Sequence, residues 1–266
     1  MPVQLAIHGA AGRMGRRVVA LAADDTDFQI TSAIEHADNA VLGQDAGLLA
    51  GIPAVGVELS DQWPAFADVV IDFSLPAAVD AVVANCVAAK IPLVMATTGL
   101  SDVQKQLLVD AARSLPIVWA PSMSMAVNLT MKLAQQVTET LKDVAGGIDV
   151  EILERHHRFK ADAPSGTALR FGELIAERLG GEVKHVHGRE GETGQRTRNE
   201  IGYHAIRVGD NPGEHTIVFG MLGERIELNV AASNRDCYAS GALAAAKFLR
   251  GRSDGLYNMF DVLGLN

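Results

Sequence analysis

The sequence has little of what would mark a disulfide-rich, membrane-spanning or nucleic-acid-binding protein. Its 266 residues include two cysteines, Cys86 and Cys237, too few for a disulfide framework, so we expect inert core thiols and a cytoplasmic location. The longest apolar stretch, residues 77–91, is interrupted by two charged residues and an asparagine, so we expect no membrane contact. Lys and Arg number 23 against 32 Asp and Glu, and this net charge of −9 argues against nucleic-acid binding.

What is present is typical of an ordinary globular protein. The chain is 48% hydrophobic and 21% charged, with 26 glycines and 9 prolines. At about 150 residues per domain, its length predicts one large domain or two modest ones.

The first 120 residues alternate between apolar strand patterns and amphipathic helix patterns. Strands are expected over 3–7, 28–34, 69–73, 92–96 and 117–120, and helices over 13–23, 76–89 and 101–114. This alternation predicts an α/β half whose parallel sheet is covered on both faces.

The second half follows another pattern. Helices are expected over 128–142, 167–179 and 241–250, and strands over 148–153, 200–208, 215–219 and 224–232. Successive strands separated by short turns predict an α+β domain built on a mostly antiparallel sheet. Residues 180–198 are expected to form a long flexible loop.

A glycine-rich loop follows the first predicted strand. Gly9, Gly12 and Gly15 depart by one residue from the usual dinucleotide spacing, and a tight turn without a ligand is the alternative. Glu35, 20 residues beyond Gly15, ends the second predicted strand, where a carboxylate can accept the ribose hydroxyls. The next residue, His36, is a weak clamp for a 2′-phosphate, which favours NADH over NADPH and leaves dual use open.

A short basic segment opens the second half. Residues 154–160 contain three formal positive charges and two histidines, His156 and His157, and the Ser165-Gly-Thr start of a helix follows. Cations beside a helix N-terminus suit a substrate with two carboxylates, and His or Lys can supply protons. We interpret residues 155–160 as a local cationic pocket in an acidic chain. The alternative is a solvated loop in which Ser165 or Thr167 only caps a helix.

Other candidates are weaker. His185 and His187 lack a third ligand at a recognisable spacing, and we expect no metal. Met123 is interpreted as packing or as a contact to a nicotinamide ring. Arg235 is either a surface residue or a partner for a carboxylate.

Several motifs together resemble the 4-hydroxy-tetrahydrodipicolinate reductase family of the diaminopimelate route to lysine. They include the glycine loop 9–15, Thr97-Thr98-Gly99 and Gly213-Glu214-His215. The most specific is Glu154-x-His156-His157-x-x-Lys160-x-Asp-Ala-Pro-Ser165-Gly-Thr-Ala, and the resemblance spans essentially the whole chain.

The resemblance implies a role for each matching position. His156 would be the general acid/base and Lys160 a proton donor. Substrate would be bound by His157, Ser165, Gly166 and Thr167. The cofactor, NADH and/or NADPH, would be held by Gly9, Ala10, Ala11, Gly12, Arg13, Met14, Glu35, His36, Ala96, Thr97, Thr98, Ala120, Pro121, Ser122 and Met123.

The chain departs from the family pattern at three places. Ala96 stands where a glycine is usual, residues 120–123 read Ala-Pro-Ser-Met instead of Ala-x-Asn-Phe, and His36 stands where many members have arginine. These departures change the side chains available for contacts at 120–123 and weaken an NADPH preference.

The chain order and the resemblance lead to further expectations. We expect a dinucleotide-binding domain of residues 1–124 plus 235–266, and a substrate-binding and oligomerisation domain of residues 125–234. The family implies hydride transfer to C4 of the substrate ring and a homotetramer. The alternatives are a related amino-acid or imino-acid dehydrogenase without the basic segment, or a redox-sensing dinucleotide-binding regulator.

Overall fold

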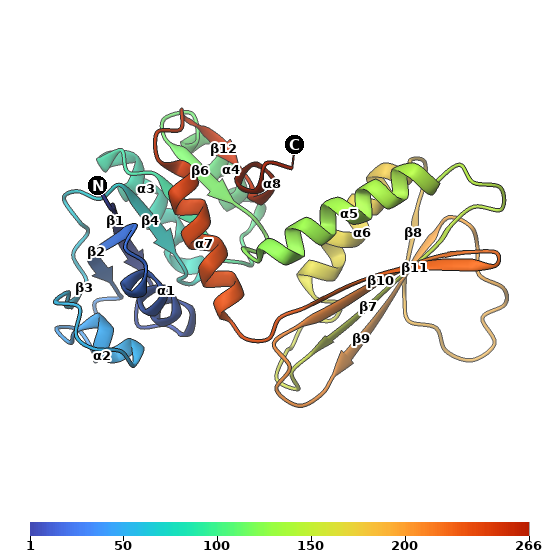
Figure 1. Ribbon diagram of the computed structural model, residues 1–266, viewed down its shortest axis with the longest axis horizontal. Coiled ribbons are helices and arrows are strands. Elements are labelled where there is room, and N and C mark those ends of the chain that lie inside the picture. Colours follow the sequence, from blue (N-terminus) through green and yellow to red (C-terminus); the bar gives the residue numbers. More distant parts are fainter. Residues whose placement is uncertain (266) are drawn as a thin grey trace. The chain divides into compact units, whose positions relative to one another are not determined.

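The computed structural model describes residues 1–265 and divides the chain into two units (Figure 1). The first unit combines Met1–Met125 with the segment from Arg235 onward, and the second unit is Ala126–Asn234. The first unit is therefore built from two separate stretches of chain. No helix among residues 1–265 is both long and apolar enough to cross a membrane.

The first unit contains a seven-stranded parallel sheet in the order β12-β6-β5-β4-β1-β2-β3. Its strands are β1 (Val3–His8), β2 (Phe28–Ile34), β3 (Leu59–Ser60), β4 (Val69–Asp72), β5 (Leu93–Met95), β6 (Pro116–Trp119) and β12 (Gly255–Tyr257). Every residue of β4 and β5 is buried, as expected of strands covered on both faces. The predicted parallel α/β fold is confirmed.

Helices cover both faces of this sheet. One face carries α1 (Arg13–Asp24), α2 (Ala46–Ala50), α7 (Asp236–Leu249) and α8 (Met259–Leu263), whose apolar residues share one core with Leu5, Ile7 and Ile71. The other face carries α3 (Val79–Ala89), which the short helix η1 (Pro76–Ala78) precedes, and α4 (Asp102–Ala111). All predicted elements of this half are present, with their ends shifted by a few residues.

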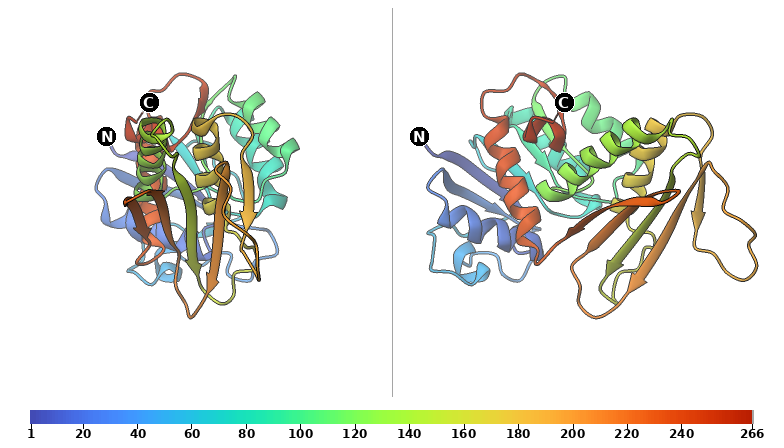
Figure 2. Two further views of the ribbon diagram at one scale, coloured as in Figure 1. Left: turned by 90° about the vertical axis from the view of Figure 1, so that its right-hand side faces the viewer. Right: turned by 45° about the vertical axis from the view of Figure 1, so that its right-hand side comes forward.

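The second unit contains a five-stranded sheet in the order β11-β10-β7-β9-β8. Its strands are β7 (Asp149–His156), β8 (Lys184–His187), β9 (Glu200–Arg207), β10 (Glu214–Met221) and β11 (Glu224–Ala231). Helices α5 (Met125–Leu141) and α6 (Gly166–Leu179) lie on one side of it (Figures 1 and 2). The predicted strands and the α+β class are confirmed.

The second sheet is mixed. β10 pairs antiparallel with β7 and β11, whereas β9 pairs parallel with β7 and β8. These parallel pairings arise because the chain crosses back twice, through α6 between β7 and β8 and through residues 188–199 between β8 and β9. The prediction of one loop over 180–198 is wrong at 184–187, where β8 adds an edge strand to β9.

Two boundaries differ from the prediction in ways that concern the site. β7 continues past residue 153 to His156, which pairs with Arg207 of β9, so the sheet fixes the backbone of His156. Helix α7 begins at Asp236, before the predicted start at 241, and the Asp236 carboxylate accepts hydrogen bonds from Arg17 of α1 at 2.6 and 3.0 Å.

Candidate active site

The glycine loop turns sharply between β1 and α1. Gly9 has φ +75°, and a Cβ there would lie 2.8 Å from the carbonyl oxygen of Phe73. A side chain at Gly15 would collide with the Gly9 carbonyl. Only glycine fits these two positions, so the glycines allow the tight turn and its close packing against the backbone that follows β4.

The start of α1 and Glu35 complete this part of the site. The helix begins after Gly12 without a side-chain cap, which leaves first-turn N–H groups for an anion. The Glu35 carboxylate lies against the loop and accepts hydrogen bonds from the N–H groups of Ala11 and His36, each at 3.0 Å. A glycine-rich turn, an uncapped helix start and a carboxylate fit the pyrophosphate and ribose of a dinucleotide.

The predicted segments 96–98 and 120–123 directly follow β5 and β6, so they lie at the same carboxyl edge of the sheet as the glycine loop. Thr98 and Pro121 are exposed in them, and the other residues are buried: Ala96, Thr97, Ala120, Ser122 and Met123. Met123 packs in the core of the first unit.

A buried carboxylate that was not among the predicted site residues joins the ends of three of these strands. Asp72, at the end of β4, is fully buried and accepts hydrogen bonds from His8 Nδ1 and Thr97 Oγ1, both at 2.6 Å. It thus ties the residue before the glycine loop to the segment after β5. A carboxylate at the end of a buried apolar strand was the available signal.

His36 is exposed and lies between two carboxylates. Its side chain is 76% exposed, and its Nδ1 is 3.7 Å from the carboxylate of Asp38. Nδ1 also accepts a hydrogen bond from the Asp38 N–H at 3.2 Å. With Glu35 as its other neighbour, this position presents an acidic surface.

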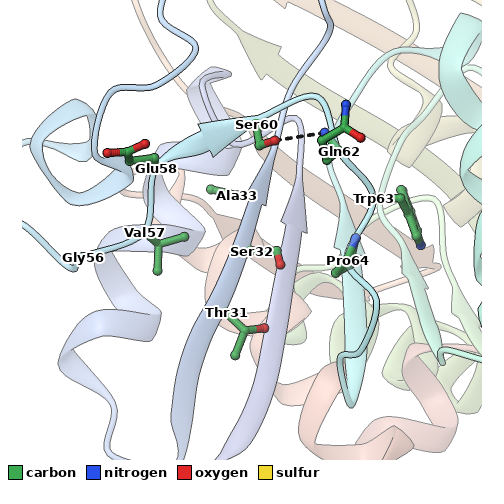
Figure 3. Close-up of a pocket in the computed structure, with 10 residues that line it drawn as sticks. All are labelled: Thr31, Ser32, Ala33, Gly56, Val57, Glu58, Ser60, Gln62, Trp63 and Pro64. Carbon is green, nitrogen blue, oxygen red and sulfur yellow. Dashed lines mark hydrogen bonds between the residues drawn. The ribbon is translucent and has the colours of Figure 1, made fainter.

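A separate pocket of about 350 Å³ lies beside β2 and β3 (Figure 3). It is lined by Thr31, Ser32, Ala33, Gly56, Val57, Glu58, Ser60, Gln62, Trp63 and Pro64. None of the predicted site residues lines it, and we assign it no role.

In the second unit, His156 ends β7 and is 8% exposed. Its Nδ1 lies 2.5 Å from Oε2 of Glu154. Burial lowers the pKa of His156, Lys160 and Arg207 lower it further, and Glu154 acts in the opposite direction. The imidazole is therefore mostly neutral at pH 7.

Lys160 is held close to the same segment. Its Nζ donates hydrogen bonds to both carboxylate oxygens of Asp162, at 2.7 and 2.8 Å. Asp162 was not among the predicted site residues, although it lies within the motif that contains them. The paired lysine provides a fixed cation.

Ser165 caps α6, which agrees with the simpler interpretation of this position. Its Oγ accepts a hydrogen bond from the Ala168 N–H at 3.1 Å. Gly166 and Thr167 are the first residues of the helix, where N–H groups have no partner within the helix. The cap therefore orders a helix start that can also bind a carboxylate.

Two further histidines belong to this part of the second unit. His157 is half-buried, and its Nδ1 has no hydrogen-bond partner among the described residues. His215 of β10 is buried, and its Nε2 lies 3.0 Å from Ser165 Oγ. Burial lowers the pKa of His215 to about 4.

The predicted cationic pocket is smaller than the run of charges in the sequence. Side chains alternate along β7, so Arg155 is exposed on the face opposite His156 and donates to Glu214 at 3.0 Å. Arg158 is also exposed. Arg207 of β9 was not among the predicted site residues. Its positive charge lowers the pKa of His156 and of the carboxyls of Glu154 and Asp162.

Comparison with known proteins gives consistent matches along the whole chain. The family model described as dihydrodipicolinate reductase, N-terminus, matches residues 3–123, and the model described as dihydrodipicolinate reductase, C-terminus, matches residues 126–263. The 4-hydroxy-tetrahydrodipicolinate reductase of Rhodopirellula baltica is 69% identical over 272 residues, covering 100% of this chain and 97% of the relative. That of Alkalilimnicola ehrlichii is 45% identical and covers 100% of both.

A solved structure shows the same similarity. A dipicolinate-bound dihydrodipicolinate reductase from Paenisporosarcina sp. TG-14 superposes with a TM-score of 0.76 at 26% identity, covering 98% of this chain and 99% of that one.

Proposed function

Since the chain belongs to the dihydrodipicolinate reductase family, we propose that it reduces 4-hydroxy-tetrahydrodipicolinate to tetrahydrodipicolinate with a nicotinamide cofactor. The observation that carries this proposal is the grouping of His156, Lys160 and the start of α6 on one short stretch of the second unit. A proton-exchanging imidazole, a fixed cation and free helix N–H groups are the groups that reduction of a dicarboxylate requires.

The first unit supplies the cofactor site in this proposal. Residues 9–14 hold the pyrophosphate, Glu35 binds the adenosine ribose, and segments 96–98 and 120–123 flank the nicotinamide. When bound, the reduced nicotinamide would supply a hydride to C4 of the substrate ring; the 4-hydroxyl and one ring hydrogen leave as water, and one proton from the protein balances the hydride.

The second unit holds the substrate. The N–H groups of Gly166 and Thr167 bind one carboxylate at the start of α6, and His157 and Lys160 contribute to the binding of both. A related reductase binds dipicolinate, a ring dicarboxylate, which supports this assignment. Ser165 acts by ordering the helix start through its cap.

Lys160 and His156 have different roles in proton transfer. Negative charge develops on the ring nitrogen as reduction proceeds, and a positioned cation lowers the energy of that transition state. The Lys160 ammonium is held by both carboxylate oxygens of Asp162, so we assign it as the donor. His156, which burial keeps mostly neutral, serves as the acid/base that exchanges protons with solvent or substrate.

The acidic surface around His36 favours NADH. A 2′-phosphate would meet the carboxylates of Glu35 and Asp38, and His36 supplies no permanent positive charge. NADPH is used less well than NADH because no arginine is present at residue 36 to offset this repulsion.

We also propose a cytoplasmic homotetramer formed through the second sheet. The face of this sheet opposite the buried residues Ile152 and Ile217 carries Leu153, Ile206 and Val218, which are partly or largely exposed. A second copy packed on this face would bury these apolar side chains.

The proposed function is tested by mixing the enzyme with freshly made substrate and following the NADH absorbance, with NADPH in a parallel assay. The expected result is oxidation of both cofactors, with a higher kcat/KM for NADH. Failure to oxidise either cofactor would overturn the proposed reaction.

A further inference from the structure

A buried carboxylate lies two residues before His156 on the same face of β7. Glu154 is 1% exposed, and its Oε2 lies 2.5 Å from Nδ1 of His156. It is the only hydrogen-bond partner of that imidazole among residues 1–265. The resemblance placed Glu154 in the family motif without a role, and the contact suggests one.

Glu154 is kept ionised by its other partners. Arg207 donates two hydrogen bonds to it, from Nη1 at 2.8 Å and Nη2 at 2.7 Å, and the Ser165 N–H donates a further one at 3.0 Å. Burial alone would raise the pKa of Glu154, but the hydrogen bonds from Arg207 and His156 outweigh it and lower the pKa. An ionised carboxylate only accepts hydrogen bonds, so the Nδ1 of His156 must carry a hydrogen.

The opposite edge of the ring is left open by a glycine. A Cβ at Gly213 would lie 2.9 Å from Nε2 of His156, so this glycine leaves room beside that nitrogen. With its hydrogen on Nδ1, the neutral imidazole presents an unprotonated Nε2, ready to accept a proton.

We propose that Glu154 is a positioning residue. It fixes the Nδ1–H tautomer of His156, and it holds the imidazole ring at a fixed position relative to the start of α6. The first role follows from the contact with Nδ1, and the second from the hydrogen bond that Ser165 donates to the other oxygen. The consequence for catalysis rests on the proposed function, because it requires that His156 exchanges protons with the substrate.

The same network extends to Lys160. Arg207 donates a hydrogen bond from Nη2 to the backbone carbonyl of Asp162 at 2.6 Å, and the carboxylate of Asp162 accepts hydrogen bonds from Lys160. Glu154 therefore helps to position both groups that carry protons. It contacts His156 directly, and it is linked to Lys160 through Arg207 and Asp162.

Glu154 is the group that favours the protonated form of His156. The other charged or titratable groups in its surroundings are Lys160 and Arg207, which oppose a positive imidazole, and His215, whose ring is neutral at pH 7. Replacing the carboxylate by an amide removes the favourable charge, so the pKa of His156 must fall.

The test compares Glu154→Gln with Glu151→Gln. Glu151 is a matched control because it lies on β7 too, on the opposite face, and is bonded to a histidine and two arginines: His204 at 2.8 Å, Arg189 at 2.7 Å and Arg196 at 3.1 Å. Each variant removes one carboxylate from a network of ion pairs, but only the Glu154 carboxylate contacts His156.

Two measurements are made on each protein. Nitrogen NMR of the imidazole, recorded against pH without cofactor or substrate, reports the tautomer and the titration of His156. Steady-state kinetics give kcat, KM and the pH dependence of kcat/KM.

The wild type is expected to show hydrogen on Nδ1 and none on Nε2 at neutral pH. In Glu154→Gln, His156 should titrate at lower pH, the corresponding limb of the kinetic profile should move the same way, and kcat should fall by about 10–100-fold, part of the full value of acid–base catalysis. Glu151→Gln should keep the wild-type titration and profile.

Hydrogen on Nε2 in the wild type would overturn the inference even if Glu154→Gln fails to fold. So would the same His156 titration in both variants. If the wild type lacks reductase activity but shows the Nδ1–H tautomer, the proposed function fails and the positioning of His156 by Glu154 stands.

Discussion

Acidification should destabilise the second unit through His215. This ring is 4% exposed, and burial lowers its pKa from 6.5 to about 4. Above pH 6.5 it is neutral in both folded and unfolded chains. Between pH 6.5 and about 4 the unfolded chain binds a proton that the folded chain does not, so the free energy of unfolding falls as the pH falls.

The size of the effect follows from the two pKa values. At about 1.4 kcal/mol for each pH unit, the interval from 6.5 to about 4 corresponds to a loss of about 3 kcal/mol. Below the folded pKa the loss from this residue is complete. The lowered pKa of His156 adds a loss of the same sign.

The matched variant is His215→Gln, since the glutamine amide can occupy the place of Nε2 beside Ser165 Oγ and cannot titrate. Urea unfolding followed by far-ultraviolet circular dichroism, at pH 7, 6, 5 and 4 and one protein concentration, gives the stability of each protein. The variant should lose about 3 kcal/mol less than the wild type across this range. Parallel losses in the two proteins would refute the assignment of a buried neutral imidazole.

Three further predictions concern the proposed reaction and its cofactor. Lys160→Ala and His156→Ala should each lower kcat by about 10²–10⁴-fold, and an unchanged kcat in both would contradict their roles. Asp72→Asn leaves one oxygen to accept from two donors, His8 and Thr97, so it should lower the free energy of unfolding by about 1–3 kcal/mol. It should also raise the Kd for NADH measured by fluorescence titration. An unchanged Kd would show that Asp72 does not support the cofactor site. His36→Arg should lower the Kd for NADPH by about 10-fold with little change for NADH, and equal effects on both cofactors would contradict charge-based selection.

The fold class was predictable because its signal is local. An apolar run such as residues 69–72, buried throughout, identifies a strand covered on both faces before any pairing is known. Strand β8 was missed because Lys-His-Val-His lacks an apolar face and is stabilised by distant contacts, including His187 stacked on Tyr203 at 5.0 Å. The parallel pairing of β7 with β9 depends on the whole crossover through α6, which no short window contains.

In the candidate site, too, the residues close together in the sequence were predictable and those brought together by long-range pairing were not. His156, Lys160 and Ser165 were identified because they lie within a dozen residues of one another. Arg207, the partner of Glu154, was not identified, because it is 53 residues away in the sequence and comes close only through strand pairing. The exposure of Arg155 could have been inferred from the alternation of side chains along a strand, had the end of β7 been placed at His156.

The division of the first unit into two stretches sets an order for its assembly during translation. The second unit, Ala126–Asn234, is continuous and can complete its sheet as soon as it leaves the ribosome. The first unit must wait, because its edge strand β12 and helix α7 are synthesised last. Until Lys247 reaches Asp25 and Asp27, and Asp236 reaches Arg17, the face of the first sheet that α7 covers remains open. The nascent chain therefore carries an incomplete first unit throughout synthesis of the second unit.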